Sequence, residues 1–186
     1  PPQTNEVRRS AVLIAAGHWL AARHGLPLEL SELGASAGPN LPWDRYRLDL
    51  PGGGFGPGRA GLRLSPDWRG DLPPAAVPHV AGRAGVDLNP LDPLRDRLRI
   101  LSYIWPDQPD RLERTRSEMD EAARLRPRVD RGDAAGWLAA RLAQPMPGGL
   151  DLVFHTVAWQ YFPPDTRKAC RDALAEAGAR ATPEAP

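Results

Sequence analysis

The stretch "LELSELGASAG", residues 28–38, decides the fold that we expect for this chain. Its first six residues are typical of a short buried strand, and small residues follow directly. Glycines in such a bend let the backbone approach a ligand closely, because no side chain intervenes. We expect a helix after the bend, whose free amides and positive dipole end would face the same ligand. Two interpretations stay open here: a tight turn alone, or a cradle for a phosphate, a carboxylate or a nucleoside.

The composition is that of an ordinary globular chain. Its 186 residues are 41% hydrophobic and 25% charged, with a formal net charge of +1. This charge creates no strong field for nucleic acid or a membrane, so we expect neither as a partner and favour a small-molecule substrate. The single cysteine excludes an internal disulfide and a cysteine zinc cluster, which favours a cytoplasmic protein without a metal site. No stretch approaches the ~20 apolar residues of a membrane span.

Helices and strands are expected to alternate along the chain. Helical patterns cover residues 6–24, 93–126 with a break at "WPDQP", 134–143 and 163–180. Strand patterns cover residues 28–33, a segment ending at Asp87, a segment leading into Asp133, and residues 150–157. This order predicts an α/β fold of the Rossmann-like three-layer type, with a mainly parallel sheet and right-handed crossovers.

We expect one domain over residues 1–186. A Gly/Pro-rich segment at 51–74 is expected to be a hairpin insertion, with "AGLRLS" as one of its strands. The charged segment "DRLERTRSEMDEAARLR" is expected to present a solvated face. Because the chain starts without methionine and ends in a loop-like tail, we expect a piece of a longer protein, with a sheet that is incomplete at its C-terminal side.

Four candidate ligand segments fall at the carboxyl ends of the expected strands, where parallel sheets bind their ligands. They are "GASAG", "DLNPLD", "GDAAGW" and "HTVAWQY". No Lys-Ser/Thr pair follows the first of them, which excludes a Walker P-loop, and its spacing differs from the dinucleotide fingerprint. Convergence of the four segments on one sheet edge predicts the site there.

The spacing acid-x-Gly-x-Ser-x-Gly, formed by Glu32, Gly34, Ser36 and Gly38, resembles the first motif of class I S-adenosylmethionine-dependent methyltransferases. That motif reads acid-x-Gly-x-Gly-x-Gly, so Ser36 replaces its middle glycine. The resemblance implies S-adenosylmethionine as the cofactor. It also implies that Asp87, or Asp92 as second choice, holds the ribose hydroxyls at the end of the second strand.

Further positions follow from the same resemblance. It places Asp133 near the adenine, and Asn40 joins the motif residues and Asp87 in the cofactor-binding set. Lining of the pocket is expected from Asn5, Glu6, Arg45, Trp159 and Gln160. Simpler roles are open for several of these side chains: a helix cap for the N-terminal pair, a surface ion pair for Arg45, and core packing at the sheet edge for Trp159.

His155 and Tyr161 are the candidate catalytic residues. A histidine at a strand end is suited to act as a general base, because its ordinary pKa is near 6.5. A hydrogen-bonded structural histidine is the open alternative. Ser36 also fits the Gly-x-Ser-x-Gly elbow of α/β-hydrolases, with Asp133 and His155 following in the Ser-Asp-His order. The sequence therefore leaves three functions open: a methyltransferase with an unknown small acceptor, a non-catalytic nucleoside-binding or interaction module, and a serine hydrolase.

Several uncommon strings together resemble the domain-of-unknown-function family 2332 of bacterial proteins. They are "QTNEVRRS" at 3–10, "ELGASAGPNLPWDRY" at 32–46, "RAGVDLNPLD" at 83–92, "WPDQPDRLERT" at 105–115, "RGDAAGWL" at 131–138 and "LVFHTVAWQY" at 152–161. That family usually reads "GLNL" where this chain has "GPNL", so Pro39 removes one amide donor. The resemblance implies a fold but no assigned reaction.

Overall fold

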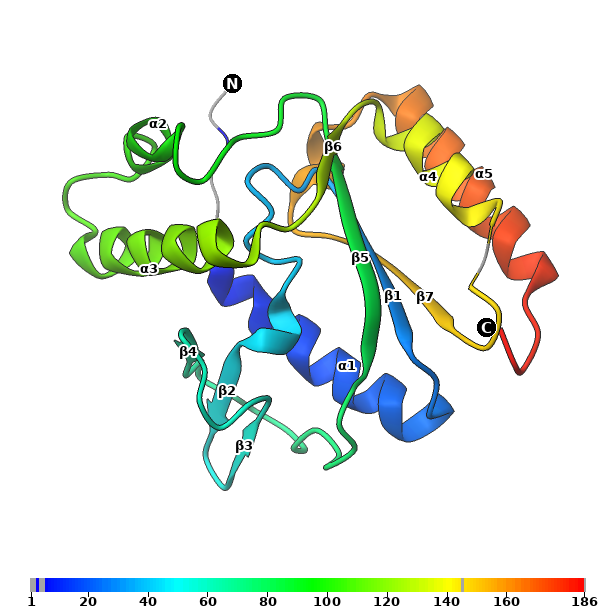
Figure 1. Cartoon of the computed structure of the whole chain (residues 1–186), viewed down its shortest axis with the longest axis horizontal. Coiled ribbons are helices and arrows are strands. Elements are labelled where there is room, and N and C mark those ends of the chain that lie inside the picture. The colour runs from blue at the N-terminus through cyan, green and yellow to red at the C-terminus, as the bar shows by residue number, and fades with distance from the viewer. Residues whose placement is uncertain (1–2, 4–5, 145, 186) are drawn as a thin grey trace.

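A four-stranded parallel sheet forms the centre of the molecule (Figure 1). The structure is a computed structural model that describes residues 3, 6–144 and 146–185. The strand order is β6-β5-β1-β7, in which β1 (Leu28–Leu33) lies between β5 (Val80–Asp87) and β7 (Leu150–His155), and β6 (Val129–Arg131) pairs with β5. The expected α/β fold with a central parallel sheet is thereby confirmed.

The direction of chain progression reverses beside β1. From β1 the chain moves to β5 and then to β6, whereas β7 returns to the opposite side of β1. The sheet therefore has a topological switch point between β1 and β7. In open α/β sheets, ligands bind in the crevice outside the carboxyl ends of the strands at such a point.

Helices cover both faces of the sheet (Figure 1). On one face lies α1 (Ser10–His24), preceded by the short helix η1 (Val7–Arg9), and on the other lie α4 (Ala134–Leu142) and α5 (Pro164–Arg180). Side chains along β1 point to both faces of the sheet. Leu30 packs in the hydrophobic cluster with α1, and Leu33 packs in the cluster with α4 and α5. The β5–β6 connection contains α2 (Arg97–Leu101) and α3 (Pro109–Leu125).

The helix expected after the bend is absent. Residues 34–42 form turns, and the next element is the three-residue helix η2 (Trp43–Arg45). Pro39 and Pro42 interrupt this segment and lack the amide hydrogens that a helix needs. Trp43 is fully buried, and its indole lies so close to Gly17 of α1 that a Cβ there would approach a ring carbon to 2.2 Å. The segment after the bend is thus held by the packing of Trp43 on α1, without forming a helix.

A small three-stranded sheet follows η2. It contains β2 (Arg47–Leu50), β3 (Gly53–Phe55) and β4 (Arg63–Leu64), in the order β3-β2-β4. β2 and β3 form an antiparallel hairpin, whereas β4, from the segment "AGLRLS", pairs with β2 in parallel and is not a hairpin strand. Leu48, Phe55 and Leu64 are buried in the main core, so this segment completes the core beside α1.

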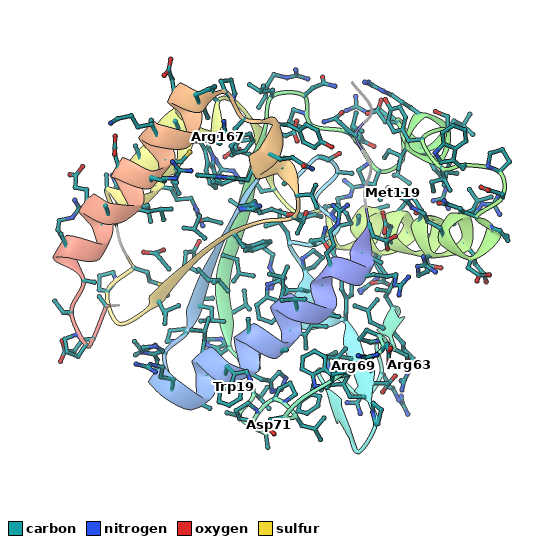
Figure 2. The ribbon with its side chains drawn as sticks, turned by 180° about the vertical axis from the view of Figure 1, so that it is seen from behind. Trp19, Arg63, Arg69, Asp71, Met119 and Arg167 are labelled. Atoms are coloured by element: carbon teal, nitrogen blue, oxygen red, sulfur yellow. The ribbon has the colours of Figure 1, made fainter. Side chains whose placement is uncertain are left out.

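Seen from behind, α1 crosses in front of the main sheet, with the small sheet beside it (Figure 2). Met119 of α3 lies near the N-terminal end of α1 in this view. None of the helices in the described part of the chain has the length and apolar character to cross a membrane.

Candidate functional site

The small-residue bend lies at the carboxyl edge of the sheet, and its amides are bonded inside the protein. The amides of Gly34 and Ala35 donate to Val86 O at 2.8 and 3.0 Å, and that of Gly38 donates to Ala35 O. Ser36 has a positive φ of 55°, a strained conformation for a residue with a side chain. These bonded amides leave little for a phosphate to bind, so the chemistry of this edge rests on side chains.

The Asp87 carboxylate lies on the same edge as the bend. Its Oδ2 accepts the Ser36 amide at 2.9 Å, and its Oδ1 accepts the Asn89 amide at 2.8 Å. Its Oδ1 also accepts the Gln3 side-chain amide at 3.0 Å, which brings the N-terminal segment across the edge. Two of the three donors are fixed backbone, and the third is a side chain that a ligand hydroxyl can replace.

Glu32 is the most unusual group at the switch point. It is fully buried, its Oε1 accepts the Thr156 hydroxyl at 3.2 Å, and its Oε2 has no partner among the described residues. Desolvation raises the pKa of this carboxyl to about 8, although the Thr156 hydrogen bond and the Arg9 charge oppose the shift. The negative charge of Asp87 adds to the increase. Glu32 is therefore mostly protonated at neutral pH.

The segment that leads into α1 closes over this edge. Arg9 donates to Thr156 O at 2.9 Å, and Ser10 donates to the buried Asn40 side chain at 2.8 Å. The side chain of Glu118, from α3, accepts the Val7 amide at 2.9 Å. Glu118 is fully buried, which corrects the expectation that its segment only presents a solvated face. This burial raises the pKa of Glu118 to about 8.

Glu6 caps η1, as its Oε1 accepts the Arg8 amide at 3.1 Å. The other oxygen lies 3.6 Å from Arg111 and 3.8 Å from Arg114 of α3. Glu6 thus holds the N-terminal segment to α3. Asn5 lies outside the described residues.

His155 lies on the opposite face of the sheet from Glu32. His155 follows Phe154, which packs in the cluster with α1, so alternation along β7 places His155 on the face with α5. Its ring stacks on Trp159, with centroids 5.5 Å apart, and partial desolvation lowers its pKa. Gln160 and Tyr161, in η3 (Ala158–Tyr161), are exposed.

Asp133, Arg45 and Asp92 each bond to neighbouring residues of their own segment. Asp133 caps α4 by accepting the amides of Ala135 and Gly136 at 2.9 and 3.2 Å. Arg45 is exposed and pairs with Asp44 at 3.4 Å, the surface ion pair that the sequence left open. Asp92, the second choice for the ribose, accepts the amides of Leu94 and Arg95.

The Ser-Asp-His arrangement of a hydrolase is not assembled. Ser36 Oγ is buried without a hydrogen-bond partner in the described part of the chain. The Asp133 carboxylate caps a helix, and the His155 ring stacks on Trp159. No hydrogen bond joins these three side chains within the residues that the structure describes, so nothing activates the serine.

The comparisons identify a family. A family model described as "Uncharacterized protein conserved in bacteria (DUF2332)" matches residues 1–186. The chain belongs to this family. No curated protein and no solved structure matches it. Membership of DUF2332 confirms the family resemblance carried by the uncommon strings, and it assigns no reaction.

Sequence reasoning missed several residues of this edge. The Gln3 amide donates to Asp87, the Thr156 hydroxyl donates to Glu32, and Arg9 donates to the Thr156 carbonyl. The sequence around these three residues gives no sign of these contacts. Glu118 had a signal: it falls in the stripe of buried residues Thr115, Glu118, Met119 and Ala122 on α3. A charge inside such a stripe predicts a buried group.

Proposed function

We propose that this domain binds a cationic nucleoside at the switch point, with S-adenosylmethionine as the ligand, and that it serves a methyltransferase-type function on a small acceptor. The observation that carries the proposal is Glu32. A fully buried carboxyl with an unpartnered oxygen at a switch point is costly unless something pairs with it. An ammonium or sulfonium group is a partner of the right charge.

The residues present fit this ligand at two positions. Glu32 would face the positive charge of the amino-acid end or the sulfonium, and Asp87 would accept ribose hydroxyls in place of the Gln3 amide. Glu32 and Asp87 are close enough for the charge of Asp87 to raise the pKa of Glu32. The bend itself is buried, and Ala158 covers Gly34 so closely that a Cβ there would lie 2.3 Å away. Binding at Asp87 requires the Gln3 side chain to move away, because its amide occupies Asp87 Oδ1.

When bound, S-adenosylmethionine supplies an electrophilic methyl group. The chain's own contribution would be to exclude water and to hold the ligand in line with an acceptor, which needs little acid–base chemistry. His155 lies on the opposite face of the sheet from Glu32 and Tyr161 is exposed, and this scheme requires neither of them.

Calorimetric titration with S-adenosylmethionine and S-adenosylhomocysteine tests the proposal. We expect a saturable heat for the native chain and a loss of about tenfold or more in affinity for Asp87→Asn, because an amide accepts ribose hydroxyls less strongly than a carboxylate does. Asp172→Asn, a change of the same kind on the exposed face of α5, is the control and should bind as the native chain does. No heat from the folded native chain with either ligand would overturn the proposal.

The second candidate is a non-catalytic module of the same fold. The bonded amides of the bend favour it, because they leave the edge without the donors that the first motif normally offers. Binding of S-adenosylhomocysteine without methyl transfer to any acceptor in a small-molecule panel would support this module over the enzyme.

A further inference from the structure

Two cavities adjoin on the other side of η2, away from the carboxyl edge. One has a volume of about 390 Å³ and the other about 360 Å³. Both are lined by Asp44, Arg45 and Pro57, so they meet at the Arg45 side chain. Together they form a groove between the start of β5, the small sheet and the end of α3. We call it the η2 groove. Each cavity has the size of a small-molecule site.

One end of the η2 groove is basic. Its lining contains Arg45, Arg59, Arg83 and Arg124. Arg83 forms two hydrogen bonds to Asp44, at 2.5 and 3.0 Å, and Arg124 pairs with Glu121 at 2.7 Å. Asp44 and Glu121 balance two of the four guanidinium groups, which leaves two positive charges at this end.

The two remaining charges are accessible. Arg59 is exposed and forms no ion pair within the residues that the structure describes. The Arg45 side chain is 61% exposed and its contact with Asp44 is 3.4 Å long, while Asp44 is already bonded twice by Arg83. Guanidinium forks bind phosphate and carboxylate oxygens in pairs, so this end is built for an anion. A phosphate monoester carries the matching charge of about two at neutral pH.

The other end is apolar and aromatic, with two unsatisfied ring nitrogens. Ile14, Val80, His18 and Trp43 line it. Trp43 is fully buried and His18 is 3% exposed, yet Trp43 Nε1 and His18 Nε2 have no partner among the described residues. His18 Nδ1 lies 3.1 Å from Pro74 O. A carbonyl only accepts, so Nδ1 carries the proton.

The His18 ring adds no charge to this end of the groove. Burial lowers the pKa of His18, so its ring is neutral at pH 7 and Nε2 is an acceptor. Trp43 Nε1 is a donor. Trp43 Nε1 and His18 Nε2 have almost no accessible surface, so a ligand ring at this end would contact the ring carbons and the apolar side chains of Ile14 and Val80.

We propose that the η2 groove binds an aromatic phosphate monoester, with the phosphate between Arg45 and Arg59 and the ring beside Trp43 and His18. The groove lies against η2 and the start of β5, so this site is separate from the edge that holds Glu32 and Asp87. The proposal stands independently of S-adenosylmethionine binding.

The test uses phenyl phosphate as the probe, with inorganic phosphate and phenol as its two halves. We expect phenyl phosphate to bind at least tenfold more tightly than either half, because both ends of the groove are engaged. In a ¹H–¹⁵N spectrum, the Trp43 indole resonance should shift with phenyl phosphate and not with inorganic phosphate. Arg45→Ala and Arg59→Ala should each weaken phenyl phosphate about tenfold, as expected for loss of one charge-assisted contact.

Arg95→Ala is the matched control, since the Arg95 side chain is 84% exposed and lies outside the groove. It should leave the affinity unchanged. Equal affinity for phenyl phosphate and inorganic phosphate would reduce the groove to an anion site and overturn the aromatic half. Absence of binding by the folded chain, or binding that leaves the Trp43 resonance in place, would overturn the proposal. Both arginine variants replace exposed side chains, and thermal melts confirm that they remain folded.

Discussion

Replacing Glu32 by glutamine should make the protein more stable at neutral pH. The carboxyl is fully buried and its pKa is raised to about 8 from 4.5. Because the folded pKa lies above the unfolded one, the native state holds a proton that the unfolded chain releases between these values. The stability contributed by protonated Glu32 is complete below pH 4.5 and is lost as the pH rises to about 8.

The size of this effect follows from the shift. Each pH unit between the two pKa values costs about 1.4 kcal/mol, so from pH 4.5 to pH 7 the native protein loses about 3 kcal/mol through this one group. Glutamine does not ionise and keeps an oxygen for the Thr156 hydroxyl. Its amide NH₂ replaces the protonated oxygen, which also lacks a partner among the described residues. The substitution should therefore remove the pH-dependent loss without a large new penalty.

Urea unfolding of the native chain and Glu32→Gln at pH 5.5, 6.5 and 7.5 measures this directly. The free energy of unfolding of the variant should exceed that of the native chain by an amount that grows by about 1.4 kcal/mol per pH unit. Glu176→Gln, at a side chain that is 76% exposed, should leave the pH slope unchanged. Parallel pH profiles for the native chain and Glu32→Gln would refute the assignment of a raised pKa to this carboxyl.

Three further substitutions test the packing of the sheet edge and the cap of α4. Gly34→Ala should cost about 2–3 kcal/mol in unfolding free energy, because its Cβ would lie 2.3 Å from that of Ala158 and its φ is +73°. Gly136→Ala, with nothing within 4 Å, should instead be neutral or gain up to about 1 kcal/mol, and unequal shifts in melting temperature distinguish the two. Asp133→Ala should lose about 1 kcal/mol through the missing cap of α4; a melting temperature equal to that of the native chain would contradict this role.

The sheet strands could be predicted from the sequence because each carries its own local pattern. Residues 28–33 and the segment ending at Asp87 form β1 and β5 with the expected ends, and the break at "WPDQP" separates α2 from α3. The segment after the bend could not be predicted in this way. Its glycines and prolines fit a loop or a helix start equally well, and Trp43 packing against Gly17 of α1 decided the outcome.

The sequence predicts the sheet edge at which the candidate residues lie, but not the contacts that these residues make. Placing Glu32 and Asp87 on one edge needs only the strand ends. Which donors those carboxylates bind depends on contacts with Gln3, Arg9 and Thr156 across long sequence separations, and no local pattern encodes these. Glu32 pairs with Phe154 across β1 and β7, so His155, one residue further along, points to the other face of the sheet. A shift of one residue in this register would exchange the two faces.

The proton balance of S-adenosylmethionine binding reports on the Glu32 carboxyl itself. If the ligand's positive charge pairs with Glu32, the carboxyl must lose its proton, so calorimetric titration at pH 7 in two buffers of different ionisation enthalpy should report release of up to one proton per site. Glu32→Gln should abolish that release. Absence of binding heat, or binding with no proton release from the native chain, would rule out Glu32 as the partner of the ligand's positive charge.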